Sequence, residues 1–468
     1  MTDSAKIAVK QNDPGNGSDL YKKREKIYQR HPTGYFQKLR VLTIWLTLGV
    51  YFLGPWLAWD GRQAILFDLP QRKFYIFWFT FWPQDFLYLS WLLIIAAFSL
   101  FFITVLAGRV WCGYTCPQTV WTTFFMWIEY ITEGDRNQRI KLDAQPMSFT
   151  KFRKKFSKHS LWLALAFWTG FTFVGYFMPV RELWFDLFYL NISGWAAFWI
   201  FFFTMATYTN AGWMREQVCM YMCPYARFQS VMFDRDTLIV TYDENRGEPR
   251  GSRKKTADPQ ALGLGDCINC QLCVQVCPTG IDIRNGLQYE CIGCAACVDA
   301  CDAVMEQMNY PTGLIRYSTE NAVEGKQSRI LRPRLIGYGV MLSLMIVVFL
   351  SFVFARVPLE LDIIRDRNAL YRENWQGNIE NTYTLKVMNK SQEPQEYSLE
   401  VSGLEDVIVH LPEKIDTLPG ELLTVAVTLE MDPDNLEQRN QTVYFTVQSL
   451  SHPEQQVTED SRFLSPRR

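Results

Sequence analysis

The sequence predicts a multidomain protein in which an α-helical membrane part, with about five transmembrane helices, is joined to a cysteine-rich domain and to a C-terminal all-β immunoglobulin-like sandwich. Five uncharged stretches are long and apolar enough to cross a bilayer. Eight of the twelve cysteines lie between Cys267 and Cys301. Short segments of alternating apolar and polar residues fill the last part of the chain. With 468 residues and a formal net charge of −1, the chain offers no electrostatic case for binding nucleic acid.

The two cysteine runs have the same spacing. They read Cys267-x2-Cys270-x2-Cys273-x3-Cys277-Pro278 and Cys291-x2-Cys294-x2-Cys297-x3-Cys301. This is the ligand pattern of a two-cluster bacterial-type ferredoxin, in which the fourth cysteine of each run binds the other cluster. The pattern therefore predicts two [4Fe–4S] clusters. One is expected on Cys267, Cys270, Cys273 and Cys301, and the other on Cys291, Cys294, Cys297 and Cys277.

Two other readings of the cysteines are weaker. Pairs with two intervening residues also bind zinc, so a pair of zinc sites is the alternative. A disulfide framework is typical of small secreted chains and does not suit a long membrane protein. The second run departs from the pattern because Asp302 stands where proline would follow the last cysteine. Asp302 is not a ligand, so we expect a different local turn rather than loss of a cluster.

The apolar stretches divide the chain into predicted domains. The expected spans are Val41–Trp59, Phe86–Gly108, Leu161–Val180, Trp195–Met214 and Leu335–Ala355. A sixth run, Phe74–Trp82, is too short to span and is rich in aromatic residues, which predicts an interfacial or re-entrant segment. The predicted domains are an N-terminal arm (1–38), a four-helix membrane domain (39–214), a ferredoxin domain (215–334), a fifth transmembrane helix (335–356) and an exported domain (357–468).

The charges of the loops predict the orientation in a bacterial inner membrane. Lysine and arginine are frequent in the N-terminal arm and in the loop between the second and third spans, and rare in the loops 60–85 and 181–194. The positive-inside rule then places the first two regions in the cytoplasm. Alternation places the ferredoxin domain in the cytoplasm and the C-terminal domain in the periplasm. Every cysteine falls on the predicted reducing side, in agreement with this orientation.

The C-terminal region predicts short strands separated by turn residues. The expected strands are Tyr383–Met388, Glu396–Val401, Asp406–Leu411, Leu422–Leu429 and Thr442–Val447. Turn residues such as Gly403 and Pro433 separate them. Strands of this length and spacing are typical of an immunoglobulin-like sandwich.

The four remaining cysteines form two copies of the pattern Cys-x-Tyr-x-Cys-Pro. Cys112 and Cys116 follow the second expected span, and Cys219 and Cys223 follow the fourth. A helical turn places residues four apart on one face. Proline directly after the second cysteine suits the first turn of a new helix. Each pair is therefore expected at a break between helices at the membrane surface.

Three interpretations of these pairs remain open. They could be small residues that pack a helix corner, a redox-active dithiol, or a soft metal site. Met220 and Met222 flank the second pair, and thiolate with thioether ligands favours Cu(I) over harder ions. The candidate metal ligands are thus Cys112, Cys116, Cys219, Cys223, Met220 and Met222.

Missing residue types exclude other chemistries. The chain has only four histidines, and none lies inside an expected span, so histidine pairs cannot hold haems within the membrane. The spans contain no acidic or basic residue that could relay protons. No glycine-rich dinucleotide fingerprint follows a predicted strand, so a bound nicotinamide or flavin is not supported.

The order of these features resembles the CcoG family of cytochrome c oxidase accessory proteins, also called FixG or RdxA. The resemblance covers the chain after about residue 30. Its most specific parts are Trp111-Cys112-Gly-Tyr-Thr-Cys116-Pro117 and Cys219-Met-Tyr-Met-Cys223-Pro224, combined with the two-cluster ferredoxin and the exported tail.

The resemblance implies a cupric reductase that matures a cbb-type haem–copper oxidase by reducing Cu(II) to Cu(I). Copper would be a substrate or a transiently bound ion, and Cys112, Cys116, Cys219 and Cys223 would be the catalytic groups. The implied partners are copper ions, a copper chaperone or transporter, subunits of the oxidase and membrane lipid.

Two other functions remain open. The membrane half is also similar to the polyferredoxin subunits of nitrate and nitrous-oxide respiration, which implies an electron-transfer subunit between quinol and a respiratory enzyme. The exported domain suits a non-catalytic assembly scaffold.

Overall fold

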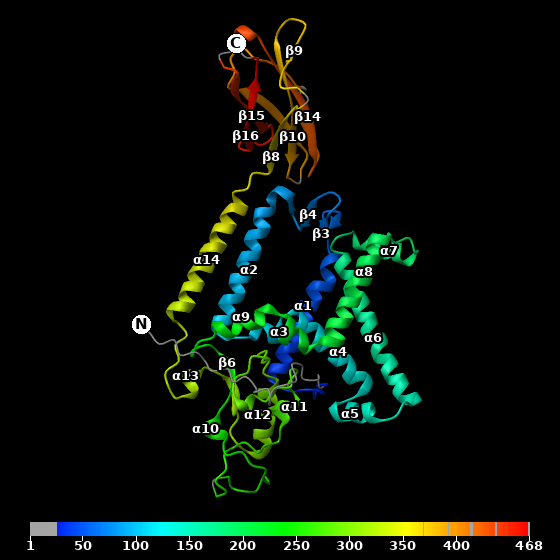
Figure 1. Cartoon of the computed structure of the whole chain (residues 1–468), viewed down its shortest axis with the longest axis vertical. Coiled ribbons are helices and arrows are strands. Elements are labelled where there is room, and N and C mark those ends of the chain that lie inside the picture. Colours follow the sequence, from blue (N-terminus) through cyan, green and yellow to red (C-terminus); the bar gives the residue numbers. More distant parts are fainter. Residues whose placement is uncertain are drawn as a thin grey trace, which may run out of the picture. The chain divides into compact units, whose positions relative to one another are not determined.

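The computed structural model describes residues 26–466 except 260, 368, 392, 412–414 and 436–437 (Figure 1). Residues 1–25 of the predicted arm 1–38 therefore lie outside the described residues. The chain divides into two compact units. The first comprises Met1–Leu69 and Leu89–Val347, and the second comprises Pro70–Tyr88 and Val348–Arg468. The membrane helices and the cysteine-rich region share the first unit.

Helices dominate the first unit. They are α1 (Tyr35–Leu53), α2 (Phe86–Ala107), α3 (Val110–Tyr114), α4 (Pro117–Glu133), α5 (Arg136–Ala144), α6 (Phe149–Val174), α7 (Val180–Phe188), α8 (Gly194–Thr207), α9 (Pro224–Met232), α10 (Glu244–Gly247), α11 (Leu272–Gln275), α12 (Ala296–Met308), α13 (Glu320–Val323) and α14 (Pro333–Phe354). Two π-helical segments, η3 (Tyr208–Met214) and η4 (Val218–Met222), connect α8 to α9. Short strands β1 (Ala58–Trp59), β2 (Arg62–Gln63) and β3 (Ile65–Asp68) follow the 3₁₀ turn η1 (Gly54–Trp56).

Three helices in the described part of the chain are long and apolar enough to cross a membrane. They are α1 with its 3₁₀ extension to Trp56, α2 and α14, and they coincide with the first, second and fifth expected spans. The other two expected spans fall on α6 and on α8 with η3. These two helices pack closely, because a Cβ on Gly170 of α6 would lie 2.7 Å from the carbonyl oxygen of Ile200. The chain is thus membrane-associated, and the count of five spans stays a prediction.

The cysteine-rich region is closed by a two-stranded sheet. Strand β6 (Ile239–Tyr242) precedes both cysteine runs and β7 (Ile315–Ser318) follows them. The two strands pair antiparallel, with Ile239 opposite Ser318. Their apolar side chains share one core with Val298 and Met305 of α12. The chain therefore returns to β6 after the second run, and the paired strands pack against the region that carries both runs.

A buried group of charges joins α4 to its neighbours. Glu129 of α4 is 1% exposed and forms ion pairs with Arg215 at 2.7 Å and with Arg139 at 3.0 Å. Lys158 of α6 lies 3.6 Å from Glu129. Burial by itself opposes ionisation of Glu129, but Arg215, Lys158 and Arg139 outweigh it and lower its pKa to about 2. One carboxylate thus ties together three segments that are distant in sequence.

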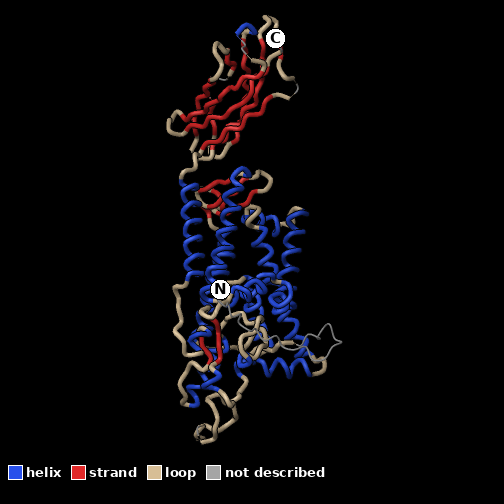
Figure 2. Tube along the Cα trace, turned by 60° about the vertical axis from the view of Figure 1, so that its left-hand side comes forward, coloured by secondary structure: helices blue, strands red, loops and turns tan. Residues whose placement is uncertain are grey.

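The second unit contains a sandwich of two antiparallel sheets (Figure 2). Its strands are β8 (Leu359–Arg365), β9 (Arg372–Glu373), β10 (Ile379–Asn389), β11 (Gln395–Ser402), β12 (Ile408–His410), β13 (Ile415–Thr417), β14 (Leu422–Met431), β15 (Asn440–Ser449) and β16 (Gln456–Leu464), with one 3₁₀ turn, η6 (Pro433–Asn435). One sheet has the order β12-β14-β10-β8, with β9 on β10, and the other has the order β13-β11-β15-β16. Tyr383 and Phe445 meet between the sheets with ring centroids 5.1 Å apart.

The aromatic segment Phe74–Trp82, expected to be interfacial or re-entrant, forms a β-hairpin. Strand β4 (Lys73–Ile76) pairs with β5 (Phe79–Phe81), and Phe77 in the turn has a φ of 52°. The following 3₁₀ turn (Pro83–Asp85) brings the buried Asp85 to Arg356 at 2.6 Å and to Lys390 at 3.2 Å. Ion pairs therefore join the turn after the hairpin to the sandwich, and an interfacial or re-entrant position of the segment stays a prediction.

We expect Glu129→Gln to reduce the free energy of unfolding by about 3–5 kcal/mol, because it leaves buried cations without their carboxylate. The lowered pKa fixes the pH dependence. The contribution of Glu129 is present above its ordinary pKa of 4.5 and is lost as the pH falls toward about 2. Thermal unfolding in detergent should show a constant difference from wild type above pH 4.5 that shrinks below it. Equal midpoints at pH 7 would contradict this account. Glu182→Gln, at an exposed position of α7, is the control.

Candidate metal centres

Both cysteine runs adopt the same backbone turn. Asn269 and Gln271 in the first run have φ values of 54° and 57°. Gly293 and Ala295, at the equivalent positions of the second run, have φ values of 64° and 56°. Turns with left-handed residues point successive backbone N–H groups to one side and form cavities that suit anionic iron–sulfur groups. The repeated spacing in the sequence thus corresponds to a repeated cradle, followed in each run by a helix, α11 or α12.

The first expected ligand set draws its fourth member from the second run. Cys267 and Cys273 are buried and Cys270 is exposed. Burial, together with the neighbouring Cys273, Cys267 and Cys270, raises the pKa of the Cys301 thiol to about 12. Cys301 therefore lies next to the three leading cysteines of the first run. This is the arrangement that an exchange of fourth ligands requires.

The second expected ligand set lines a single cavity. Cys277 of the first run and Cys291, Cys294 and Cys297 of the second run face it, and Cys273 also reaches its wall. The remaining walls are largely apolar and include Ile281, Ile283 and Ile292. Burial raises the pKa of Cys291 to about 12, and a bound metal would hold such a thiol in its thiolate form. The residues present thus fit a cluster with thiolate ligands.

The structure after the last cysteine differs between the two runs, and this explains why Asp302 stands where the first run has a proline. In the first run, α11 ends at Gln275, before Cys277, and Pro278 lies outside any helix, whereas in the second run the chain continues after Cys301 in α12 to Met308. Proline at position 302 would interrupt that helix. The Asp302 carboxylate accepts a hydrogen bond of 2.7 Å from the backbone of Gly313, which secures the loop before β7.

The two Cys-x-Tyr-x-Cys-Pro motifs form helix corners, as the sequence predicts. Cys112 lies in α3 and Cys219 in η4. Cys116 and Cys223 are the residues before α4 and α9, and each of these helices begins with the proline of the motif. A proline at that place costs no helical hydrogen bond because the first N–H groups of a helix have no partner within it.

The two corners bring their four thiols into one group, which we call the corner thiols. Burial, together with the neighbouring Cys116, Cys112 and Cys223, raises the pKa of Cys219 to about 12. Burial, with a smaller contribution from Cys116, raises the pKa of Cys112 to about 11. Thiols that affect one another's pKa lie near one another, because charge interactions weaken with distance. The two copies of the motif, which are distant in sequence, therefore lie side by side in the structure.

The corner thiols lie against the second ligand set. Cys112 packs with Ile292 and Cys294 in one apolar cluster. A Cβ on Gly113 would lie 2.9 Å from both the carbonyl oxygen of Ile292 and the Cα of Cys294, so only glycine permits this approach. Cys219 lines a small cavity together with Pro278, Thr279 and Ile292. Both corners thus touch the loop that carries the second set.

Arg109 fixes this contact. Its buried guanidinium donates to the carbonyl oxygen of Cys291 at 3.2 Å and to that of Ala226, in α9, at 2.6 Å. It also donates to the carbonyl of Tyr289. The equivalent residue before the second corner, Arg215, pairs instead with Glu129. The sequence shows an arginine before each motif, but only the structure separates their roles.

The structure gives less support to the methionines and to a preformed copper site. Met222 is 59% exposed, so most of its side chain lies outside the corner thiols. Met220 is half-buried in η4. Within the described ranges, no three side chains of histidine, cysteine, aspartate or glutamate converge closely enough to hold a single metal ion. Copper at the corners would therefore be bound by a pair of thiols, whereas each cysteine of a cubane binds a different iron.

Comparison with known families assigns both parts of the chain that carry these features. Residues 214–320 match the model described as a 4Fe-4S dicluster domain. Residues 349–466 match the model described as the IG-like fold at the C-terminus of FixG. The crystal structure of a FixG-related protein from Vibrio parahaemolyticus is 41% identical and covers 23% of this chain and 95% of its own, with a TM-score of 0.21.

Three curated relatives match most of the chain. Nitrogen fixation protein FixG of Rhizobium meliloti is 38% identical over 454 residues, covering 89% of this chain and 86% of its own. Protein RdxB of Cereibacter sphaeroides is 41% identical over 420 residues, covering 86% and 88%. Protein RdxA of the same organism is 39% identical over 398 residues, covering 82% and 84%.

We expect Gly113→Ala to lower stability by about 1–3 kcal/mol, because the new methyl group must displace the backbone of the second cysteine run. On heating, the Gly113→Ala variant should lose its iron–sulfur absorbance at a lower temperature than wild type. Gly49→Ala is the matched control, since a Cβ there meets no atom within 4 Å and alanine favours the helix. If Gly113→Ala behaves like Gly49→Ala, the close contact is absent.

Because each run is expected to supply the fourth ligand of the other cluster, we can predict which cysteine variants lose the same cluster. Wild type should contain about eight iron atoms per chain. Cys267→Ser and Cys301→Ser should lose the same cluster and leave the same residual electron paramagnetic resonance signal, whereas Cys277→Ser should resemble Cys297→Ser. If Cys301→Ser resembled Cys297→Ser instead, the assignment would be wrong. About two zinc atoms and no iron after anaerobic preparation would identify zinc sites.

Proposed function

Because this chain belongs to the family of FixG, RdxA and RdxB and carries a 4Fe-4S dicluster domain, we propose that it is a membrane-bound electron-transfer protein that reduces Cu(II) to Cu(I). The proposed use of the Cu(I) is assembly of the copper centre of a cbb-type cytochrome c oxidase. Copper is the substrate, and the eight cysteines of the two runs are the proposed cluster ligands.

The position of the corner thiols is the observation that carries this proposal. The eight cysteines of the two runs suffice for two clusters, so Cys112, Cys116, Cys219 and Cys223 are left for another role. Simple packing would not require four thiols in one place. Cys112 packs with Ile292 and Cys294, and the next residue, Gly113, lies against their backbone, which supports a thiol site beside the second ligand set. A substrate held there would be close to its source of electrons.

The chemistry of copper suits this arrangement. When bound, the two clusters supply electrons one at a time, and one electron separates Cu(II) from Cu(I). Thiolates prefer the softer Cu(I), so the corner thiols stabilise the product relative to the substrate. Transfer of Cu(I) to a further thiol or thioether protein then returns the corners to their free state. Each reduced chain is expected to convert about two copper ions, one for each cluster.

We extend the proposal to location and partners. The excess of lysine and arginine in the N-terminal arm and in the loop after α2 supports a multi-pass inner-membrane protein with a cytoplasmic ferredoxin domain and a periplasmic sandwich. The proposed partners are a copper chaperone or transporter and subunits of the cbb-type oxidase. The sandwich resembles binding modules and is the proposed contact with an exported partner.

We predict that the double variant Cys219→Ser/Cys223→Ser keeps both clusters but reduces Cu(II) at least tenfold more slowly. Serine is nearly the same size as cysteine but is a hard ligand that binds Cu(I) poorly. The assay uses anaerobic, dithionite-reduced and desalted protein, Cu(II) and a Cu(I)-specific chelator. Because the four thiols form one group, Cys112→Ser/Cys116→Ser should have a similar effect.

Met222→Leu is the control, since the structure leaves Met222 largely exposed and its loss should not change the rate. Loss of iron–sulfur absorbance in the double serine variants would show that cluster ligands are misassigned. An unchanged rate with intact clusters would contradict a role in copper reduction. Reduction of the clusters by quinol with no effect of copper would favour a respiratory electron-transfer subunit.

A further inference from the structure

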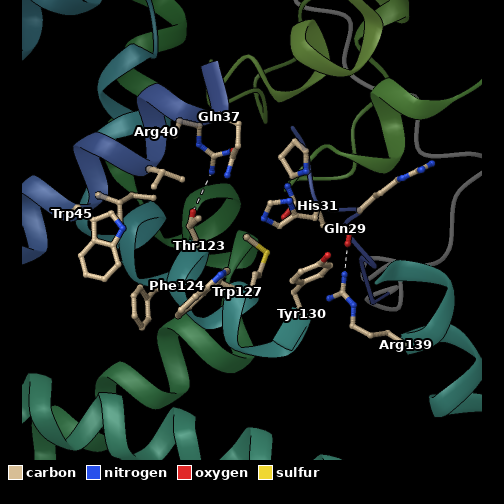
Figure 3. A pocket seen from close by; sticks show the side chains of 15 residues that line it. Gln29, His31, Gln37, Arg40, Trp45, Thr123, Phe124, Trp127, Tyr130 and Arg139 are labelled. Atoms are coloured by element: carbon tan, nitrogen blue, oxygen red, sulfur yellow. Dashed lines mark hydrogen bonds between the residues drawn. The ribbon is translucent and has the colours of Figure 1, made fainter. Parts of the chain in front are cut away.

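A cavity of about 400 Å³ lies where the N-terminal segment, α1 and α4 meet (Figure 3). Residues 29–32 form one wall, and residues of α1 and α4 form the others. The cavity lies apart from the corner thiols, and no cysteine lines it. Its volume falls in the range of small-molecule binding sites.

Much of the cavity lining is apolar, and several of these side chains are exposed. Val41 and Trp45 of α1 are 40% and 58% exposed, and Trp127 of α4 is 45% exposed. Phe124 and Ile44 also line the cavity. Val41, Ile44 and Trp45 belong to α1, one of the helices long and apolar enough to cross a membrane, so this part of the cavity suits a ligand with acyl chains. Tryptophan is typical of the boundary between acyl chains and headgroups.

The cavity also has basic residues in its lining. Arg30, His31, Arg40 and Arg139 line it, and no aspartate or glutamate does. Arg139 already has a carboxylate partner, since it pairs with Glu129 at 3.0 Å. Arg40 has none among the described residues, although it is only 1% exposed.

The side chain of Arg40 donates two hydrogen bonds to described residues, and both acceptors are uncharged. Its Nη1 donates to Gln37 Oε1 and its Nη2 to Thr123 Oγ1, both at 3.2 Å, and its Nε has no partner. Figure 3 shows its guanidinium between Gln37 and Thr123. A buried guanidinium without a counter-ion is costly, because desolvation of the charge is not compensated. A bound anion would therefore stabilise the guanidinium of Arg40.

We propose that this cavity binds one anionic phospholipid, with its phosphate group at Arg40 and its acyl chains across Trp45 and Trp127. A phospholipid has both a charged and an apolar part, so a single molecule can supply the anion for Arg40 and cover the exposed tryptophans. A quinone head is uncharged and would leave Arg40 without a counter-ion, and free phosphate would leave the exposed tryptophans uncovered. Basic pockets between membrane helices commonly bind lipid headgroups in this manner.

The lipid would stabilise the attachment of the ferredoxin region. Residues that line the cavity are also bonded to the segments beside the cluster ligands. Gln29 Nε2 donates to the carbonyl oxygen of Val276 at 2.7 Å, and the N–H of Arg30 donates to that of Gln275 at 2.8 Å. The N–H of Gln37 donates to Asp299, in α12, at 2.7 Å. A headgroup that orders this wall therefore also orders the contact between the membrane helices and both cysteine runs.

The first test counts bound lipid. The whole protein is purified in mild detergent and analysed by native mass spectrometry with lipid extraction. Wild type should retain one anionic phospholipid per chain, and Arg40→Gln should lose it at least tenfold. Arg40→Lys, which keeps the charge, should retain most of it. Arg153→Gln removes an exposed arginine of α6 outside the cavity and should retain it fully.

The second test needs no variant. Wild type in nanodiscs of phosphatidylglycerol should unfold at a higher temperature than in nanodiscs of phosphatidylcholine, and inorganic phosphate in detergent should give no such increase. The proposal is overturned if Arg40→Gln retains as much lipid as wild type. It is also overturned if Arg153→Gln loses as much lipid as Arg40→Gln. Protection by inorganic phosphate alone, equal unfolding temperatures in the two lipids, or a co-purified quinone in place of the phospholipid overturns it as well.

Discussion

The contact between Gly113 and the backbone of the second cysteine run is the constraint on which the rest of this molecule depends. It joins a membrane helix corner directly to the loop that carries Cys291 and Cys294, with no side chain between them. Arg109 holds the contact by donating to Cys291 and to Ala226 of the opposite corner. Two helical hairpins and the ferredoxin region therefore meet at one point, and the corner thiols gather there as a consequence.

Buried charges have two different roles in this unit. Glu129 is surrounded by cations from α5, α6 and the segment after η3, so its charge is satisfied within the protein and stabilises the fold. Arg40 lies close by and is equally buried, but its partners are neutral. The difference separates a structural ion-pair group from a site that an external anion completes. Arg40 and Arg139, the partner of Glu129, line the same cavity, and Gln29 and Arg30 of that cavity donate hydrogen bonds to the first cysteine run.

The sequence predicts the features that depend on local spacing. The cysteine runs, the proline at the start of α4 and the strands with strong alternation, such as β10 and β14, are found where they are expected. Edge strand β16 was missed because its outward residues are polar and its alternation is weak. The Gly113 contact and the pairing of Glu129 with Arg215 join residues far apart in the chain, so no local pattern reveals them. The sequence does not reveal the β-hairpin at Phe74–Phe81, because its aromatic residues do not alternate regularly with polar ones.

The central claim is that electrons reach copper at the corner thiols from the adjacent clusters. It is tested most directly by anaerobic stopped-flow mixing of fully reduced, desalted protein with Cu(II) and a Cu(I)-specific chelator. The account predicts that iron–sulfur absorbance recovers with the same rate constant as Cu(I) forms, with one Cu(I) per electron. Recovery of the absorbance without Cu(I), or the same rate in a variant that lacks all four corner thiols, would contradict it.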